Sequence, residues 1–317
     1  MSNLKHTATL GYAAWVLFCS CFALSASSKA LMPVPALQIV RAEIQDDDTW
    51  KFIKANGYKL PPGKSAAELS RTLSKLLGSA DPQLRDETAF DILANWIYRN
   101  RLLSDDDLRP LILEWTANLT KDIGSVGSDA VALRSFSALT LSIVVARDNA
   151  TPFLTEQEFR KILESALKYA DQERDLRGYD PVKGWLHATA HTADLLKFLA
   201  RSRYLGPADQ KAILNAVAHK LTTANLVFSF GEDERLARTV LSVVARKDFA
   251  AFEFAEWVNH MRPAPAATSQ PDISVLRADQ NVLNMLAKLY FLLKTTDGVA
   301  WAGAAADMVQ KGLDGTF

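Results

Sequence analysis

Apolar residues recur along most of this chain with the spacing of helices. From Ser65 onward they stand at positions i, i+3, i+4 and i+7 of long segments, and no alternating run of β-branched residues is bounded by hairpin turns. A shorter helical pattern near 48–56 ends at Gly57. We therefore expect an all-α chain. The longer helices are predicted near 65–78, 82–100, 105–121, 128–147, 155–174, 181–203, 208–225, 232–247, 250–261, 272–294 and 299–313.

One local pattern recurs three times at a fixed spacing. It begins at Leu103, Leu154 and Leu205, so consecutive copies are 51 residues apart. Each copy has a leucine before a helix start signal, acidic residues in the first turn and two adjacent aliphatic residues that begin a buried stripe. The preceding helices match in part, so each unit is a helix pair. Stacked pairs predict a HEAT/armadillo-like α-solenoid, and a closed helical toroid is the alternative.

The first thirty residues differ from the rest. Lys5 and His6 precede an uncharged, largely apolar run from Leu10 to Ala26, and small residues follow it. This order predicts a cleaved signal peptide over 1–30 and a periplasmic or secreted protein. The alternative is an uncleaved anchor, through which alone we expect contact with a membrane.

The rest of the chain is expected to form a single helical-repeat domain over 48–317. An extended lead-in over 31–47 precedes it, and the proline- and alanine-rich segment 262–271 is a linker-like loop within it. Cys19 and Cys21 both lie in the signal segment, so the mature chain has no thiol for a disulfide or a nucleophile.

Charge and motifs exclude several classes of function. Lysine plus arginine and aspartate plus glutamate both number 36, which leaves no basic excess to neutralise phosphates, so no nucleic-acid partner is expected. The sequence also lacks a glycine-rich phosphate loop and a serine nucleophile elbow.

One predicted helix carries two histidines. Asp180 is a good N-cap and Pro181 a good first helical residue, which predicts a helix over 181–203. On a wheel of about 100° per residue, Trp185 falls on the buried side of this helix. The opposite, polar arc holds His187, His191, Asp194 and Arg201. His219 and His260 are isolated and are expected to be structural or surface groups.

These side chains permit three interpretations. Two imidazoles at i and i+4 beside a carboxylate can hold a divalent metal, with His187, His191 and Asp194 as ligands. Ala188 stands where helical zinc proteases have a glutamate, which argues against that protease class. The second interpretation is a ligand groove, and the third is a purely structural role. The candidate groove residues are Arg177, Tyr179, Lys183, His187, His191, Asp194, Glu232 and Arg235.

The same stretch carries a family resemblance. Arg177-Gly178-Tyr179, the block from Lys183 to Leu196, and Asp233 to Ala237 resemble an uncharacterised bacterial family, domain of unknown function 2785. The resemblance spans residues 50 to 295, with its most specific part between Arg177 and Leu196. It implies a discrete domain and brings no established activity with it.

Our leading hypothesis is therefore an extracytoplasmic α-solenoid that binds an unknown protein or small-molecule ligand, or serves as a scaffold. The alternative is a hydrolase-like enzyme in which His187 or His191 is the general base, or both hold a metal that activates water. The sequence does not decide whether the chain is an enzyme.

Overall fold

The computed structural model describes residues 47–261 and 272–314. Apart from Asp47, the predicted signal peptide (1–30), lead-in (31–47) and linker-like loop (262–271) lie outside the described residues.

Most described residues lie in helices, so the all-α expectation is confirmed. Two short strands, β1 (Tyr179–Asp180) and β2 (Gly184–Trp185), form an antiparallel hairpin between α7 and α8. The helices are α2 (Asp47–Ala55), α3 (Ala66–Leu76), η1 (Gln83–Phe90), α4 (Asp91–Ala94), η2 (Asn95–Arg99), α5 (Asp105–Asn118), α6 (Ala130–Ala150), α7 (Glu156–Gln172), α8 (Ala188–Leu199), α9 (Pro207–Thr223), α10 (Glu232–Val244), α11 (Ala251–Met261), α12 (Ile273–Thr295) and α13 (Ala302–Asp314).

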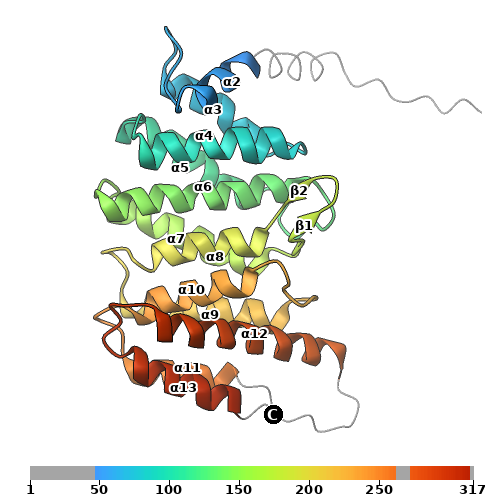
Figure 1. Ribbon diagram of the computed structural model, residues 1–317, viewed down its shortest axis with the longest axis vertical. Coiled ribbons are helices and arrows are strands. Elements are labelled where there is room, and N and C mark those ends of the chain that lie inside the picture. The colour runs from blue at the N-terminus through green and yellow to red at the C-terminus, as the bar shows by residue number, and fades with distance from the viewer. Residues whose placement is uncertain (1–46, 262–271, 315–317) are drawn as a thin grey trace, which may run out of the picture. The chain divides into compact units, whose positions relative to one another are not determined.

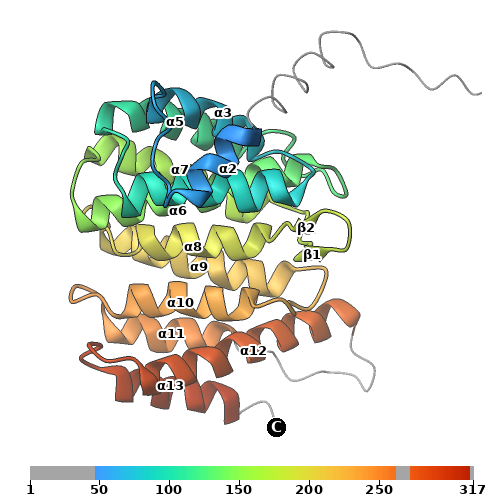
Figure 2. The same ribbon diagram turned by 45° about the horizontal axis from the view of Figure 1, so that its top comes forward.

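The helices from α5 to α12 pack in two layers. α6, α8, α10 and α12 lie side by side, with α5, α7 and α9 packed behind them (Figures 1 and 2). Apolar side chains fill the space between the layers, and Leu195 and Leu199 on α8 and Val240 on α10 are fully buried there. Burying one such side chain stabilises the fold by about 1.5–3 kcal/mol.

Helix α6 is both long and apolar. By length and composition it could cross a membrane, but 83% of its most apolar window is buried within the described part of the chain. It contacts α8 and α5 along its length, as the central helix of a protein core does.

The 51-residue pattern has a structural counterpart. Ser104 and Thr155 each close a capping box at the start of α5 and α7, and the carboxylate of Asp209 accepts from the Gly206 N–H at the start of α9. An arginine six residues after each of the first two leucines then reaches the capping acid of the next unit. These pairs are Arg109 with Glu158 and Arg160 with Asp209.

The predicted helix over 181–203 is wrong at its start. α8 begins at Ala188, and the seven positions before it belong to the hairpin and its exit. The carboxylate of Asp180 accepts from the N–H groups of Val182 and Lys183, so it closes a turn and does not cap a helix. Gly184 then takes a left-handed φ of +70°, which ends any helical path.

Candidate functional site

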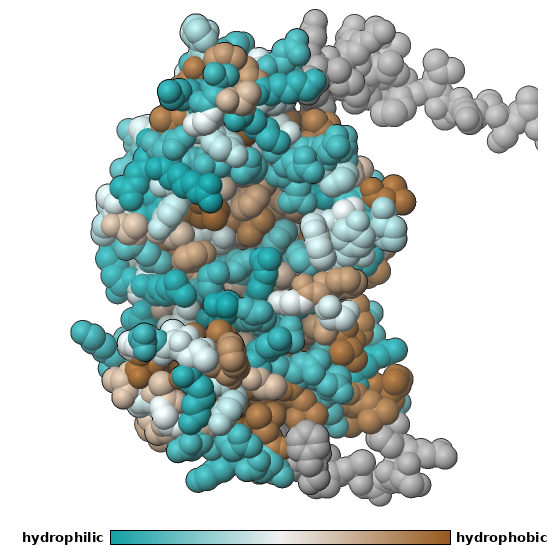
Figure 3. Space-filling view, viewed as in Figure 1, coloured by the Kyte–Doolittle hydropathy of each residue, from teal (hydrophilic) through white to brown (hydrophobic). Residues whose placement is uncertain are grey.

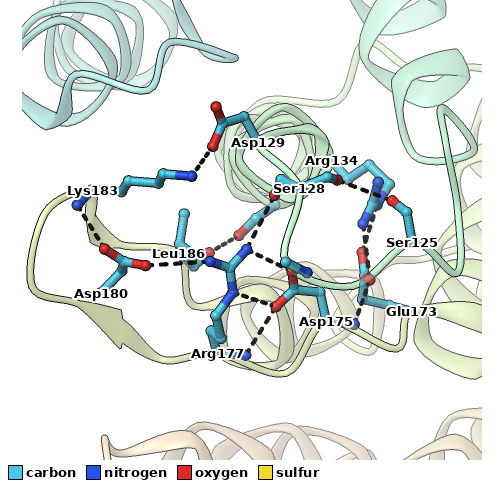
Figure 4. A network of polar contacts seen from close by, with 12 residues as sticks. Ser125, Ser128, Asp129, Arg134, Glu173, Asp175, Arg177, Asp180, Lys183 and Leu186 are labelled. Carbon is cyan, nitrogen blue, oxygen red and sulfur yellow. Dashed lines mark hydrogen bonds and ion pairs between the residues drawn. The ribbon is translucent and has the colours of Figure 1, made fainter. Parts of the chain in front are cut away.

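Arg177 anchors the hairpin to the loop before α6 (Figure 4). Its guanidinium donates to the buried carboxylate of Asp175 at 2.7 and 2.8 Å, to Asp180 at 3.3 Å and to the carbonyl of Ser128 at 3.1 Å. Asp175 in turn accepts from the N–H of Gly127 at 2.9 Å. The guanidinium of the candidate ligand residue Arg177 therefore donates its hydrogen bonds to groups of the protein itself, and it holds two loops together.

A second ion pair, between Arg134 and Glu173, lies close to the pair of Arg177 and Asp175. Arg134 on α6 donates to both carboxylate oxygens of Glu173 at 2.6 and 3.0 Å, and the two side chains are 0% and 3% exposed. Arg134 also donates to the carbonyls of Lys121 and Asp122, while Glu173 accepts from the N–H of Asp175. A buried pair with this many hydrogen bonds fixes the chain that leaves α7.

A residue from the N-terminal part of the chain binds the second strand of the hairpin, β2. The buried Arg85 of η1 donates to the carbonyls of Lys183 and Trp185 at 2.6 and 3.0 Å. The candidate Lys183 forms an ion pair with Asp129 and so points toward the loop before α6. The hairpin is therefore fixed by Arg177, which precedes its first strand, and by Arg85 from η1.

Gly178 allows the loop before α10 to approach the hairpin. A Cβ at this position would lie 2.4 Å from Cδ2 of Phe230 and 2.7 Å from Oε1 of Glu232, so no larger residue fits without displacement. Glu232, another candidate, is buried, and its carboxylate accepts from the N–H of Phe230 at 2.8 Å. Burial raises the pKa of this carboxyl. The Glu232 carboxylate therefore stabilises the loop before α10 from within.

The hairpin and this loop present an aromatic cluster, which we define as Tyr179, Trp185, His187 and Phe230. Trp185 stacks on His187 with ring centroids 4.3 Å apart and meets Tyr179 and Phe230 edge-on at 4.8 and 5.9 Å. Tyr179, Trp185 and Phe230 are 46%, 42% and 47% exposed. The expectation that Trp185 lies in the core is therefore wrong, because the hairpin turns it outward. Hydrophobic side chains gather at this edge of the molecule (Figure 3).

His187 forms the floor of the cluster and precedes α8 in a left-handed conformation, with φ 45° and ψ 35°. The residue is 7% exposed, and its Nε2 has no hydrogen-bond partner in the described part of the chain. Burial, and then the nearby Arg235 guanidinium, lower the pKa of His187 to about 4. The imidazole is therefore neutral at pH 7, with one polar nitrogen unsatisfied.

His191 lies in the core between α6 and α8. Its Nδ1 is 2.8 Å from Oγ of Ser135, and Ser135 Oγ also donates its proton to the carbonyl of Leu186. A hydroxyl has one proton, so Nδ1 of His191 must carry the hydrogen of the first bond. Burial and the neighbouring His187 hold the pKa of His191 well below its usual range.

Asp194 and Arg235 form an ion pair between α8 and α10. The carboxylate of Asp194 contacts the Arg235 guanidinium through one oxygen and Lys197 Nζ at 2.7 Å through the other. It therefore faces cations, while the rings of His187 and His191 stand 5.7 Å apart at 84°. Over residues 47–261 and 272–314, no three histidine, cysteine or acidic side chains are grouped to hold a metal. Metal binding by this set stays a prediction.

The structure thus divides the predicted site. Tyr179 and His187 come together with Trp185, Arg177 and Lys183 lie in the polar network behind the hairpin, and Asp194, Glu232 and Arg235 are held by neighbours. Sequence reasoning missed Phe230 and the exposure of Trp185. The run Asp180-Pro-Val-Lys-Gly184 is the signal that could have found the hairpin, since it reads as a turn as well as a helix start.

Comparison with known proteins agrees with the sequence resemblance. A family model described as Protein of unknown function (DUF2785) matches residues 119–291, which include the hairpin, α8 and α10. No curated protein and no solved structure matches the chain. The family match covers more than half of the chain. This protein therefore belongs to the DUF2785 family.

Proposed function

We propose that this chain is an α-solenoid binding or scaffold protein whose partner, another protein, docks on the aromatic cluster. One observation carries the proposal: three large rings at Tyr179, Trp185 and Phe230 are each more than two-fifths exposed on a hairpin that the buried Arg85 and the partly buried Arg177 hold in place. Aromatic side chains of this kind dominate the binding energy of protein interfaces.

The proposal of an α-solenoid is supported by the contacts between consecutive helix pairs. The pairs Arg109–Glu158 and Arg160–Asp209 link equivalent positions of successive units, and each capping acid thus serves its own helix and the unit before it. Successive helices of one layer also contact each other in chain order. Nearest-neighbour contacts that repeat along the chain are the mark of repeat proteins, which bind partners along extended surfaces.

Preorganisation supports binding at the hairpin. Arg85, Arg177 and the close approach at Gly178 fix the backbone that carries the rings, so a partner does not have to order it. Val182 at the turn is 82% exposed and extends the apolar surface. A partner with apolar side chains would bury these rings at little cost in conformational entropy.

The hydrolase alternative has one observation in its favour, the contact between His191 and Ser135. Two others weaken it. Ser135 gives its proton to the carbonyl of Leu186, so the imidazole does not activate this hydroxyl. A pKa of about 4 also makes His187 a weak base at neutral pH, where a general base works best near the ambient pH.

The proposal places the protein outside the cytoplasm, on the strength of the signal-like segment over 1–30. The mass of the protein purified from cells that produce the full chain tests this. Loss of the residues before position 27 or 31 is expected, and an intact N-terminus would leave only the anchored alternative.

A photo-crosslinking experiment tests the binding proposal. A photo-reactive phenylalanine placed at Val182, beside the cluster, should give a discrete crosslinked protein in cells that produce the chain. The same group at Phe252, which is 66% exposed on α11, serves as the matched control. The crosslink should disappear when Trp185→Ala is added. An equal crosslink from position 252, or one that persists without Trp185, would contradict the proposal.

A further inference from the structure

A cleft lies at the opposite end of α8 from the aromatic cluster. Its volume is about 300 Å³, and α8, at 12 residues, separates it from the hairpin by about 18 Å. The walls come from the chain just after α8, from the C-terminal half of α10 and from the connection between α12 and α13 (Figure 1). Residues on these walls include Arg201, Leu241, Ser242, Ala245, Thr296 and Val299.

Two arginines line this cleft, Arg201 and Arg246, and Arg246 pairs with Asp248. The Nε of Arg201 donates to Oγ of Ser242 at 3.1 Å, and its guanidinium lies 5.4 Å from the ring centroid of Phe198. Neither contact neutralises the charge, and no carboxylate pairs with Arg201 in the described part of the chain.

The neighbouring arginines differ from Arg201 in having carboxylate partners. Arg235, Arg238 and Arg246 each have a carboxylate partner, namely Asp194, Glu234 and Asp248. Arg201 is solvent-exposed, and partial desolvation by its neighbours together with the charge of Arg238 lowers its pKa. Asp297 also lines the cleft but forms no ion pair with Arg201.

The remaining walls suit an apolar body. Leu241, Ala245 and Val299 line the same space, and its volume is at the low end of the range for small-molecule sites, about 300–1,000 Å³. A ligand that fits must therefore be small, with an apolar part and an anionic end.

We infer that this cleft binds a small organic anion, whose carboxylate or phosphate oxygens meet the Arg201 guanidinium and the Ser242 hydroxyl. The anion supplies the charge that Arg201 lacks, while its apolar part packs on Leu241, Ala245 and Val299. The site is independent of the partner surface at the hairpin, because no residue is shared between them.

Calorimetric titration of the full chain tests this inference with three probes. Benzoate has a carboxylate on an apolar ring, benzamide is its uncharged analogue, and inorganic phosphate is an anion without an apolar part. Benzoate should bind, benzamide should not, and Arg201→Gln should weaken benzoate by about ten-fold or more, since hydrogen bonds to charged groups are the strong ones. Arg174→Gln is the matched control, because Arg174 is exposed, as Arg201 is, but lies outside the cleft.

Binding of phosphate in place of benzoate, lost in Arg201→Gln, supports the anion site and identifies the phosphate group as its ligand. Arg201→Lys keeps the charge without the planar fork, and it should bind more weakly than the parent and more tightly than Arg201→Gln. The inference is overturned if neither anion binds the parent, or if Arg201→Gln, with an unchanged circular dichroism spectrum, binds as the parent does.

Discussion

Replacing His187 with asparagine should remove its own share of the acid sensitivity of this fold, to which the buried His191 adds in the same direction. Asparagine tolerates the left-handed backbone at this position better than most residues, and it does not titrate. The pKa of His187 is about 4 in the folded protein, against an ordinary 6.5. Between these values the unfolded chain binds more protons, so stability falls as the pH drops from 6.5 toward 4. At about 1.36 kcal/mol per pKa unit, the loss approaches about 3 kcal/mol.

Urea unfolding of the parent and the variant at about pH 7.5 and about pH 4.5 measures this term directly. Buried carboxyls titrate in the same range, and burial raises the pKa of Asp86 to about 6, which changes stability in the opposite direction. The quantity to compare is therefore the loss of unfolding free energy on acidification in the parent and in the variant. The parent should lose about 2.5 kcal/mol more than His187→Asn on acidification, while exposed His260→Asn should behave as the parent. Equal losses in the parent and His187→Asn would refute the reasoning.

Two further changes test the supports of the hairpin. Arg134→Met leaves the carboxylate of Glu173 buried and unpaired, so urea unfolding should show a loss of about 3–5 kcal/mol, against less than about 1 kcal/mol for Arg238→Met in an exposed pair. Similar losses for both would contradict the structural role of the buried pair. Gly178→Ala forces Phe230 aside and should cost about 1–3 kcal/mol by the same assay, and adding Phe230→Ala should recover part of that loss. Strictly additive losses would show that the two residues do not meet.

The helices and their caps were predictable because their causes are local. Apolar spacing defines the buried face of each helix, and the capping boxes at Ser104 and Thr155 are closed by residues three positions away. The 51-residue spacing then indicated equivalent units. The ion pairs between units, such as Arg160 with Asp209, were not visible, because each joins positions 49 residues apart.

The hairpin was missed because distant residues decide it. Asp180 and Pro181 suit a helix start and a turn equally well, and the turn is held by Arg85, which donates to the carbonyl of Lys183 from 98 positions earlier. With the helix start misplaced, Trp185 was assigned to the core and His191 to a polar face. In the structure, His191 is buried against α6. The stretch was identified correctly as unusual, while the orientation of its side chains was not.

The affinity of the protein captured by crosslinking shows whether the aromatic cluster is the binding surface. With that partner purified, the dissociation constant is measured for the parent, Trp185→Ala and Phe252→Ala, two exposed aromatic positions on different elements. Trp185→Ala should weaken binding by about 30-fold, which corresponds to about 2 kcal/mol, and Phe252→Ala should change it little. Equal affinity for Trp185→Ala and the parent would contradict the claim that the aromatic cluster is the binding surface.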